Sequence, residues 1–462
     1  LTIARRDGDR TGQLSHEQLG AALVFQDKSA EGIDNAEPDE TIPNPCAPDD
    51  PRIIGRLLSS LEPALDTFSR YVDLQNESAE GRLAGLKQRA DQNKRRSIGS
   101  VSIGGARQRD WPLEIMDHKF QVREKLGEGA FGSVYLAEDL DRLAPPTRKR
   151  LNDDLDSSMA GELADLSVNS DEDPDEAEQR RLVALKVESP PNKWEFYMLN
   201  QLHSRLSPRS TESVILHRKF ISYSDTSFLL LDFGDKGTLL GLVNNAHAAG
   251  VGAGGLSGAS GPNGVEEVLA MFFVIELLRI IEDMHSNQLV HGDLKIDNCL
   301  LRIDEPPAGE TWSNSYDREG GNGWASKGLT LIDFGRSIDL KLYPAGQTFK
   351  ANWPVEAKDC REMREGLPWT YETDYHGVAA IAFCLLFGKY MEGTNVPQIK
   401  QNMRRYWQAE LWLELFNLML NTQEFTDGAQ LPILDDMRQI REKMEAWLSV
   451  NCNKSGKVSI EQ

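Results

Sequence analysis

The feature that most constrains the fold is a set of acidic and amide residues divided between two segments. The first segment reads His-Gly-Asp-Leu-Lys-Ile-Asp-Asn over residues 291–298, and the second reads Asp-Phe-Gly over residues 333–335. An Asp, an Asn five positions later and a second Asp on another strand are the minimum set for phosphoryl transfer from ATP. We predict that Asp293 accepts the proton of an attacking hydroxyl, and that Asn298 and Asp333 hold Mg²⁺. The chain therefore has to fold so that the two segments meet.

A glycine-rich loop precedes these segments and fits the pattern G-x-G-x-x-G-x-V. Glycine lets a backbone lie close to phosphate groups, and the backbone N–H groups can then reach the phosphate oxygens. Taken alone the loop could equally be an ordinary hairpin, because glycine-rich turns are common. The residues that we expect to cover the nucleotide are Gly127, Gly129, Gly132 and Val134.

A lysine follows on a strand of the V-A-I-K type, which reads Val-Ala-Leu-Lys over residues 183–186. We predict that Lys186 contacts the α and β phosphates and pairs with Glu195 on the next helix. Glu188 is the competing partner, but we expect it to lie too close on the same strand. The order of loop, lysine, glutamate, catalytic loop and Asp-Phe-Gly makes a chance match improbable.

Two further segments complete the predicted ATP site. Asp232 and Gly234 follow an apolar strand, and we expect the backbone there to meet the adenine. Lys295 lies two residues after Asp293 and should sit near the γ-phosphate.

Bulk properties narrow the partners. The net charge of −21 argues against a nucleic-acid-binding surface or a polybasic membrane contact, and it favours basic partners unless it serves only solubility. Five scattered cysteines form no C-x-x-C pair, which indicates a reducing intracellular compartment. The most apolar run, 379–387, is too short to cross a bilayer. Because the chain begins at Leu1 and not at Met, we expect it to be part of a longer protein.

The element pattern predicts an α+β protein with two lobes, a small antiparallel β-sheet lobe and a helical lobe, preceded by an extension. The predicted parts are a largely disordered extension over residues 1–110, an N-lobe over 111–235, a C-lobe over 236–450 and a tail over 451–462.

Polar and acidic segments interrupt these parts. In the extension, apolar residues at helical spacing predict one amphipathic helix over residues 53–72 that docks on the lobes. A dense acidic tract predicts a disordered insertion over residues 143–181, because it cannot bury enough apolar surface to fold. Flexible insertions are expected over residues 248–264 and 304–327.

The predicted ATP site indicates a kinase, and two details of the sequence narrow which class of kinase it is. The catalytic segment reads His-Gly-Asp where most protein kinases have His-Arg-Asp, and small-molecule kinases of the aminoglycoside and choline type share His-Gly-Asp. Those enzymes lack Asp-Phe-Gly with a long following segment, which this chain has. The runs 333–344, 368–380 and 194–197, together with 291–293, closely resemble the fungal-like Bub-type spindle-checkpoint serine/threonine protein kinases. The resemblance extends from about residue 110 to about residue 450.

The resemblance implies an ATP- and Mg²⁺-dependent protein kinase that acts in mitosis at kinetochores in the nucleus. It implies as substrates the C-terminal tail of a core histone and a co-activator of the anaphase-promoting complex. Checkpoint proteins would bind through upstream regions. It also implies that Asp374 holds backbone N–H groups behind the catalytic loop. A pseudokinase scaffold is the main alternative, because some relatives have eroded phosphate loops, and a small-molecule kinase is the remote one.

Gly292 removes the arginine that would bind a phosphate on the activation segment. We therefore hypothesise that packing of this segment, or of the N-terminal extension, replaces phosphorylation as the main activating event. No Ala-Pro-Glu precedes Asp374, so the end of the segment departs from ordinary kinases.

Overall fold

The computed structural model describes residues 41–82, 85–86, 111–116, 118–129, 132–141, 181–253, 264–307, 309–393, 395–425 and 430–452. These residues form two compact units. The sheet unit comprises residues 68–193 and 216–233, and the helical unit comprises residues 1–67, 194–215 and 234–462. The predicted insertion at 143–181 lies outside the described residues except for Arg181, as do most of the extension and tail and the central part of 248–264.

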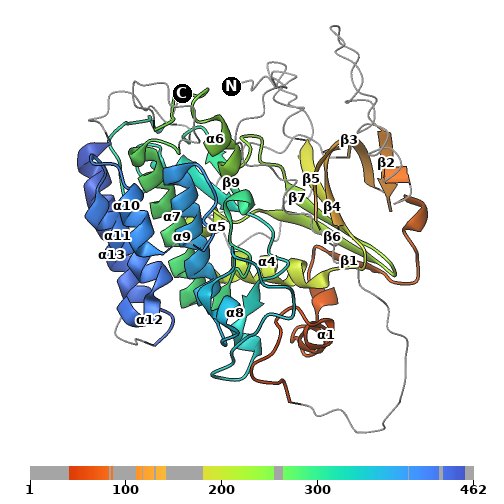
Figure 1. Cartoon of the computed structure of the whole chain (residues 1–462). Helices are drawn as coiled ribbons and strands as arrows, with labels where there is room; N and C mark the ends of the chain where they lie inside the picture. The colour runs from red at the N-terminus through yellow and green to blue at the C-terminus, as the bar shows by residue number, and fades with distance from the viewer. Residues whose placement is uncertain are drawn as a thin grey trace, which may run out of the picture. The chain divides into compact units, whose positions relative to one another are not determined.

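The sheet unit is built on one seven-stranded sheet with the order β1-β6-β7-β5-β4-β3-β2 (Figure 1). All neighbouring strands are antiparallel except β1 and β6, which are parallel. The strands are β1 (Tyr71–Leu74), β2 (Trp111–Ile115), β3 (His118–Glu128), β4 (Gly132–Asp139), β5 (Leu182–Glu188), β6 (His217–Tyr223) and β7 (Ser227–Asp232).

Alternation of apolar and polar residues explains these strands. In β2, Trp111, Leu113 and Ile115 are buried while the two residues between them are exposed, as expected for a strand with one face on the core. Their side chains join a single apolar cluster that includes Phe120 and Tyr223. The edge strand β1 was not predicted from the sequence.

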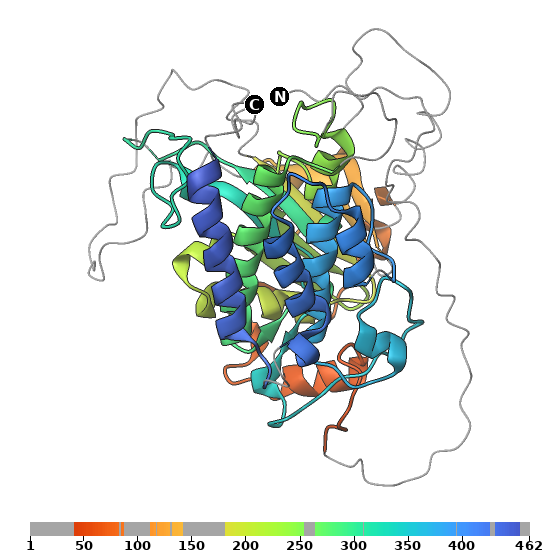
Figure 2. The ribbon, with the colours of Figure 1, turned by 60° about the vertical axis from the view of Figure 1, so that its left-hand side comes forward.

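The helical unit contains most of the helices (Figure 2). Helices α7, α9, α11 and α13 lie side by side, and α7 contacts both α9 and α13. The helices are α1 (Pro51–Ser59), α4 (Lys193–Arg205), α5 (Pro208–Thr211), α6 (Leu239–Asn245), α7 (Glu267–Ser286), α8 (Arg361–Glu365), α9 (Glu372–Phe387), α10 (Val396–Asn402), α11 (Ala409–Leu420), α12 (Thr422–Phe425) and α13 (Leu434–Asn451).

Short elements that carry the catalytic segments lie among these helices. Strand β9 pairs with β10, and β8 pairs with β11, both antiparallel. The short elements are β8 (Leu289–Val290), β9 (Cys299–Ile303), β10 (Lys327–Leu331), β11 (Ile338–Asp339) and the 3₁₀ turns η2 (Leu65–Thr67), η3 (Ile296–Asn298), η4 (Trp324–Ser326) and η5 (Leu340–Leu342).

The insertion at 304–327 differs from the flexible segment that we predicted. The ring centroid of Trp324 lies 5.4 Å from that of Phe272 on α7. The ring centroids of Tyr316 and Trp312 lie 5.0 Å and 4.8 Å, respectively, from that of Trp324. The indole N–H of Trp324 donates to the carbonyl oxygens of Ser313 and Ser315. The polar composition concealed three aromatic side chains, which bury enough apolar area to order the segment.

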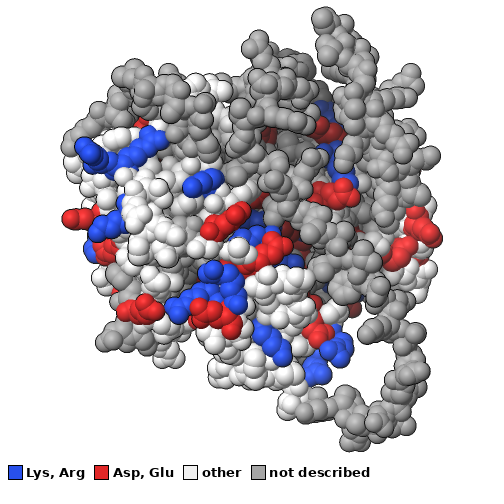
Figure 3. All heavy atoms as spheres, viewed as in Figure 1, with Lys and Arg blue, Asp and Glu red and all other residues white. Residues whose placement is uncertain are grey.

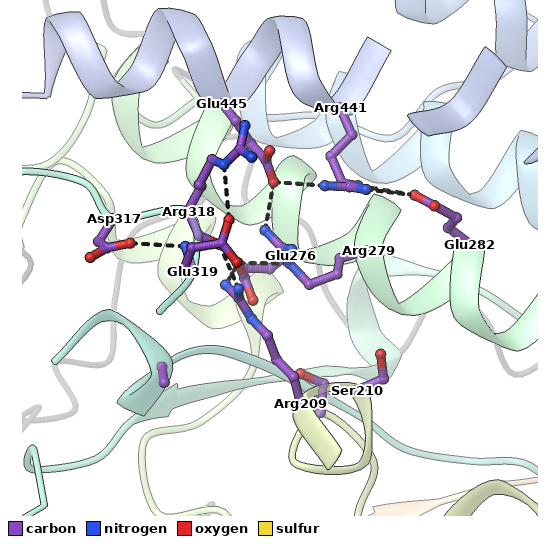
Figure 4. Close-up of polar contacts among 12 residues, drawn as sticks. Arg209, Ser210, Glu276, Arg279, Glu282, Asp317, Arg318, Glu319, Arg441 and Glu445 are labelled. Atoms are coloured by element: carbon purple, nitrogen blue, oxygen red, sulfur yellow. Dashed lines mark hydrogen bonds and ion pairs between the residues drawn. The ribbon is translucent and has the colours of Figure 1, made fainter. Parts of the chain in front are cut away.

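A buried charge network connects helix α13 with helix α7 (Figure 4). Glu445 on α13 accepts hydrogen bonds from Arg279 on α7 at 2.6 Å and from Arg441 at 2.8 Å. Arg441 also pairs with Glu282 at 3.0 Å. Because Glu445 is almost fully buried, its charge has to be matched by such partners. The network therefore holds α13 against α7.

The extension forms a shorter helix than the one predicted over residues 53–72. Helix α1 ends at Ser59, and Pro63 lies shortly after it. A proline cannot continue a helix, because it lacks the backbone N–H and clashes with the preceding turn. The predicted span therefore divides into α1, the turn η2 and strand β1.

Other expectations concern the surface and the cysteines. All five cysteines are free thiols, and four of them are buried. Within the described ranges, no helix has both the length and the apolar character needed to cross a bilayer. Acidic and basic side chains are interspersed over the helical unit on the face shown in Figure 3.

Candidate active site

The catalytic loop is held from behind by a buried carboxylate. Asp374, in the first turn of α9, accepts hydrogen bonds from the backbone N–H groups of His291 at 2.8 Å and Gly292 at 2.9 Å. His285 Nε2 lies 3.0 Å from the same carboxylate. Burial alone would raise the pKa of Asp374, but the hydrogen bond and charge of His285 lower it below its ordinary value. The role expected of Asp374 is therefore present in the structure.

Asp293, Lys295 and Asn298 lie together on this loop. Lys295 Nζ donates to Asp293 Oδ2 at 2.8 Å, and Asn298 Nδ2 donates to the backbone oxygen of Asp293 at 2.9 Å. Burial alone would lower the pKa of Lys295, but the negative charges of Asp293 and Asp333 raise it above its ordinary value. These negative charges therefore keep Lys295 protonated.

Asp333 is brought to the same place by the strand that precedes it. The backbone N–H of Ile332 donates to the oxygen of Asn298 at 3.0 Å. Asp333 has φ 67°, a left-handed conformation that few residues other than glycine adopt. Such conformations cluster at functional sites. Phe334 is fully buried, and its ring lies 4.8 Å from that of His291. The Asp-Phe-Gly segment thus packs on the catalytic loop.

Gly292 occupies a position that no side chain fits. Its φ is 77°, and a Cβ atom there would lie 2.4 Å from the backbone oxygen of Arg336. An arginine at this position would therefore force the segment after Asp333 to move. The backbone conformation at residue 292 and the close approach of Arg336 therefore both require the glycine that replaces the arginine of His-Arg-Asp.

Helix α4 holds the segment after Asp333 through residues that sequence reasoning missed. Trp194 Nε1 donates to the backbone oxygen of Ser337 at 2.7 Å, and Tyr197 Oη donates to Asp339 Oδ2 at 2.7 Å. Arg205 binds both oxygens of Asp339, at 2.9 and 2.6 Å. Burial and the charge of Asp339 raise the pKa of Tyr197, so its hydroxyl keeps the proton that it donates. The signal in the sequence that could have identified them is a pair of aromatic residues with polar tips, Trp194 and Tyr197, three positions apart on one helix.

In the sheet unit, the glycine-rich loop forms the hairpin between β3 and β4. Gly127 pairs with Val134, and the N–H of Gly129 donates to the oxygen of Gly132 at 2.8 Å. A Cβ at Gly132 would lie 2.2 Å from the oxygen of Val187, so packing requires glycine there. At Gly127 and Gly129 a Cβ would have no neighbouring atom of the described residues within 4 Å. Glycine at those two positions leaves room for a group outside the protein.

Lys186 lies beside this hairpin, since β5 pairs it with Val134. Its Nζ lies 3.8 Å from Glu188 Oε1. Our argument that Glu188 is too close to pair was wrong, because residues two apart on a strand face the same side. Glu195 is fully buried in the first turn of α4, and its pairing with Lys186 stays a prediction.

The predicted adenine-binding segment coincides with a boundary between units. The chain leaves the sheet unit at Phe233 and enters the helical unit at Gly234. Asp232 forms an ion pair with Arg218 in the sheet unit. A Cβ at Gly234 would lie 2.9 Å from Leu300 Cδ1, so glycine permits this close approach. The two predicted residues therefore belong to different units.

The oxygen atoms that Asn298 and Asp333 can offer as metal ligands in the helical unit fit an Mg²⁺ ion that is also bound by phosphates. The side-chain N–H of Asn298 is used by Asp293, which leaves the amide oxygen as the ligand atom. No group of three or more His, Cys, Asp or Glu side chains that could hold a metal ion is found among the described residues. Mg²⁺ does not require such a cage, because it is usually held by one or two carboxylates together with phosphate and water oxygens.

The fold and the catalytic segments define the class as the two-lobed protein kinases. The crystal structure of the BubR1 kinase domain superposes with a TM-score of 0.57 at 24% identity, over 88% of this chain and 98% of that one. At this level of identity the similarity establishes the fold. No family model matches the chain.

Sequence relatives define the family. The spindle assembly checkpoint serine/threonine-protein kinase bub1 of Schizosaccharomyces pombe is 40% identical over 335 residues, or 71% of this chain and 29% of that protein. Its counterpart BUB1 of Saccharomyces cerevisiae is 34% identical over 71% of this chain and 28% of its own length. The chain belongs to the Bub1 family of spindle-checkpoint kinases. It spans less than a third of the length of these two relatives.

Proposed function

We propose that this chain is an active serine/threonine protein kinase that uses ATP and Mg²⁺ in the spindle checkpoint. The observation that carries the proposal is the cluster of Asp293, Lys295, Asn298 and Asp333, held in place by hydrogen bonds between the catalytic loop and the Asp-Phe-Gly segment. A scaffold without activity would not need these side chains together. The intact glycines 127, 129 and 132 support the same conclusion.

The proposed chemistry follows from the atoms that remain available. Lys295 occupies Oδ2 of Asp293, so Oδ1 accepts the proton of the substrate hydroxyl. ATP would supply the phosphoryl group. Asn298 and Asp333 would hold Mg²⁺, which would neutralise the charge of the ATP phosphates. Lys186 and the hairpin of Gly127, Gly129 and Gly132 would position the phosphates. Preorganisation of this kind, with little covalent participation by the protein, is what phosphoryl transfer requires.

The substrates and location that we propose rest on the family resemblance and on charge. We propose that the kinase acts at kinetochores in the nucleus, on the C-terminal tail of a core histone and on a co-activator of the anaphase-promoting complex. The net charge of −21 favours such basic substrates.

A direct phosphotransfer assay tests the proposal. The chain is incubated with Mg²⁺, radiolabelled ATP and a basic histone-tail peptide, and transfer to Ser or Thr is measured. We expect Mg²⁺-dependent transfer to the peptide and none to choline or an aminoglycoside. A folded chain that labels no protein substrate would instead be a scaffold.

Contacts with the N-terminal extension support our hypothesis on activation. Asn44 Nδ2 donates to the oxygen of Gly346 at 3.0 Å, and Asn44 Oδ1 accepts from the N–H and hydroxyl of Thr348 at 3.0 and 2.7 Å. Cys46 forms a parallel bridge with Phe349, which in turn pairs with Trp369. Cys46 of the extension therefore pairs with Phe349, and Phe349 pairs with Trp369 near the end of the activation segment. This packing can hold the segment without a phosphate.

Replacement of Asn44 by Ala removes three hydrogen bonds to the activation segment. At about 1 kcal/mol each, their loss should lower kcat/KM by about tenfold or more. Arg52→Ala is the matched control, because its guanidinium is exposed and, among the residues that the structure describes, bonds only to Asp50. We also expect the wild-type chain to keep its activity after phosphatase treatment. A large loss on that treatment would show that phosphorylation is the activating event.

A further inference from the structure

Helix α9 and the residues after it approach the catalytic loop at further points besides Asp374. In the middle of the helix, a Cβ at Gly377 would lie 2.6 Å from the backbone oxygen of Leu294, so only glycine lets the helix come this close. Beyond the end of the helix, Tyr390 meets Asp297. All of these residues belong to the helical unit. The helix and the segment after it therefore follow the loop from its first residues to its last turn.

Asp297 is a buried carboxylate in this last turn, η3, directly before Asn298. Its residue is 4% exposed. Burial and the charge of Asp297 raise the pKa of the thiols of Cys299 and Cys384, so these two neighbours stay neutral. A buried carboxylate is costly unless hydrogen-bond donors reach it. The donors that reach Asp297 therefore help to fix the turn.

Tyr390 supplies such a donor. Its Oη lies 3.3 Å from both carboxylate oxygens of Asp297, so the two oxygens can share the hydroxyl proton. Burial and the charge of Asp297 raise the pKa of Tyr390, which keeps the hydroxyl protonated. The end of α9 places this side chain, because Gly388 closes the helix in the left-handed conformation with φ 69°, as helix ends favour. Tyr390 follows two residues later.

The same turn carries Asn298, whose amide oxygen is the proposed ligand of Mg²⁺. The backbone N–H of Asn298 donates to the oxygen of Lys295 at 2.9 Å, and its Nδ2 donates to the oxygen of Asp293 at 2.9 Å. Because Asp297 and Asn298 are neighbours in one short 3₁₀ turn, a displaced Asp297 side chain moves the backbone from which Asn298 projects. Residues that hold a metal ligand in place from behind typically change metal affinity by about 10–100-fold.

We propose that Tyr390 is a positioning residue for phosphoryl transfer. Through Asp297 it fixes the turn η3, and with it the amide oxygen of Asn298 that receives Mg²⁺. This role rests on the proposed function, because it takes Asn298 to be a metal ligand. Tyr390 contacts Asp297 rather than the nucleotide or the substrate, so its effect passes through that carboxylate.

Hydrogen exchange of the nucleotide-free chain gives the first test. Mass spectrometry compares the exchange of peptides that cover residues 296–299 between the wild-type chain and Tyr390→Phe. We expect the N–H of Asn298 to exchange about tenfold faster, the effect of losing one hydrogen bond to a charged group. Tyr406→Phe is the matched control, since it also removes a tyrosine hydroxyl from the helical unit, one that accepts from Arg404. No ATP or Mg²⁺ is present, so the result does not depend on phosphotransfer.

The Mg²⁺ requirement gives the second test. The Mg²⁺ concentration for half-maximal transfer to the histone-tail peptide should rise about tenfold in Tyr390→Phe, while kcat at saturating Mg²⁺ stays within about twofold. In an Asp297→Asn background, Tyr390→Phe should change exchange and Mg²⁺ requirement by less than about twofold, because the carboxylate is absent.

Unchanged exchange in Tyr390→Phe, or equal effects in both backgrounds, would overturn the proposal. Faster exchange with an unaltered Mg²⁺ requirement would also overturn it, because the hydroxyl would then support only the local fold. A wild-type chain that transfers no phosphate would refute the proposed function, and the exchange result in the two backgrounds would still decide whether Tyr390 fixes the turn through Asp297.

Discussion

Replacement of Asp293 by Asn is expected to lower kcat by about 10²–10⁴-fold, the usual contribution of a positioned general base. An amide has nearly the same shape but cannot take the proton of the substrate hydroxyl. The side chains of Asp293 and Lys295 are both partly exposed, and they form an ion pair at 2.8 Å. Such a pair contributes at most about 1 kcal/mol, so the fold should survive the change.

The measurement is the initial rate of phosphate transfer to the histone-tail peptide at saturating ATP, together with the thermal unfolding of both proteins. Asp304→Asn is the matched control, because Asp304 is an exposed aspartate just after β9. KM for ATP should change little, because Asp293 is not assigned to the nucleotide. Undiminished turnover of the Asp293→Asn protein would refute the assigned role.

Replacement of Asp374 by Asn should damage both stability and turnover. The carboxylate is fully buried and accepts hydrogen bonds from the N–H groups of His291 and Gly292 on separate oxygens. An amide has a single acceptor oxygen, so its NH₂ group would face one of these donors. We expect a loss of about 2–4 kcal/mol of unfolding free energy. Turnover should fall with it, because these N–H groups fix the loop that carries Asp293.

The pH dependence separates this effect from a general loss of packing. The pKa of Asp374 is lowered in the folded chain from its ordinary value of 3.8. A lowered pKa contributes stability above the unfolded value, and this contribution is lost as the pH falls through the folded value. The stability gap between wild type and Asp374→Asn should therefore narrow as the pH falls below the ordinary value of 3.8. Glu442→Gln, at an exposed position of α13, is the control. A gap that keeps its size at low pH would contradict the assignment.

Local sequence predicted which candidate site residues lie together on one loop, because short spacing along the chain fixes such neighbours. Asp293 and Asn298 are five residues apart on one loop, and their contact at 2.9 Å follows from that spacing. The same local reasoning failed for Glu188, where the alternation of side chains along a strand was overlooked, and the structure shows a contact with Lys186. It also failed for the helix over residues 53–72, where apolar spacing outweighed the helix-breaking effect of Pro63.

Contacts between distant segments could not be predicted in this way. Trp194 and Tyr197 support the segment after Asp333 from positions more than 130 residues earlier, at sequence separations of 143 and 142. Asn44 and Thr348 are 304 residues apart. Nothing in a local pattern specifies such pairs, because the choice of partner depends on which buried polar groups remain unsatisfied after the helices and strands have packed.

The amino-acid sequence by itself determined the fold class and predicted the kind of reaction, since an acid, an amide and a second acid in this order serve few purposes other than holding Mg²⁺ and a phosphoryl acceptor. Only the tertiary structure decided how the loop is held by Asp374, why no side chain fits at Gly292, and that the extension binds the activation segment. Spacing along the chain controls chemistry within a loop, whereas packing controls which loops become neighbours.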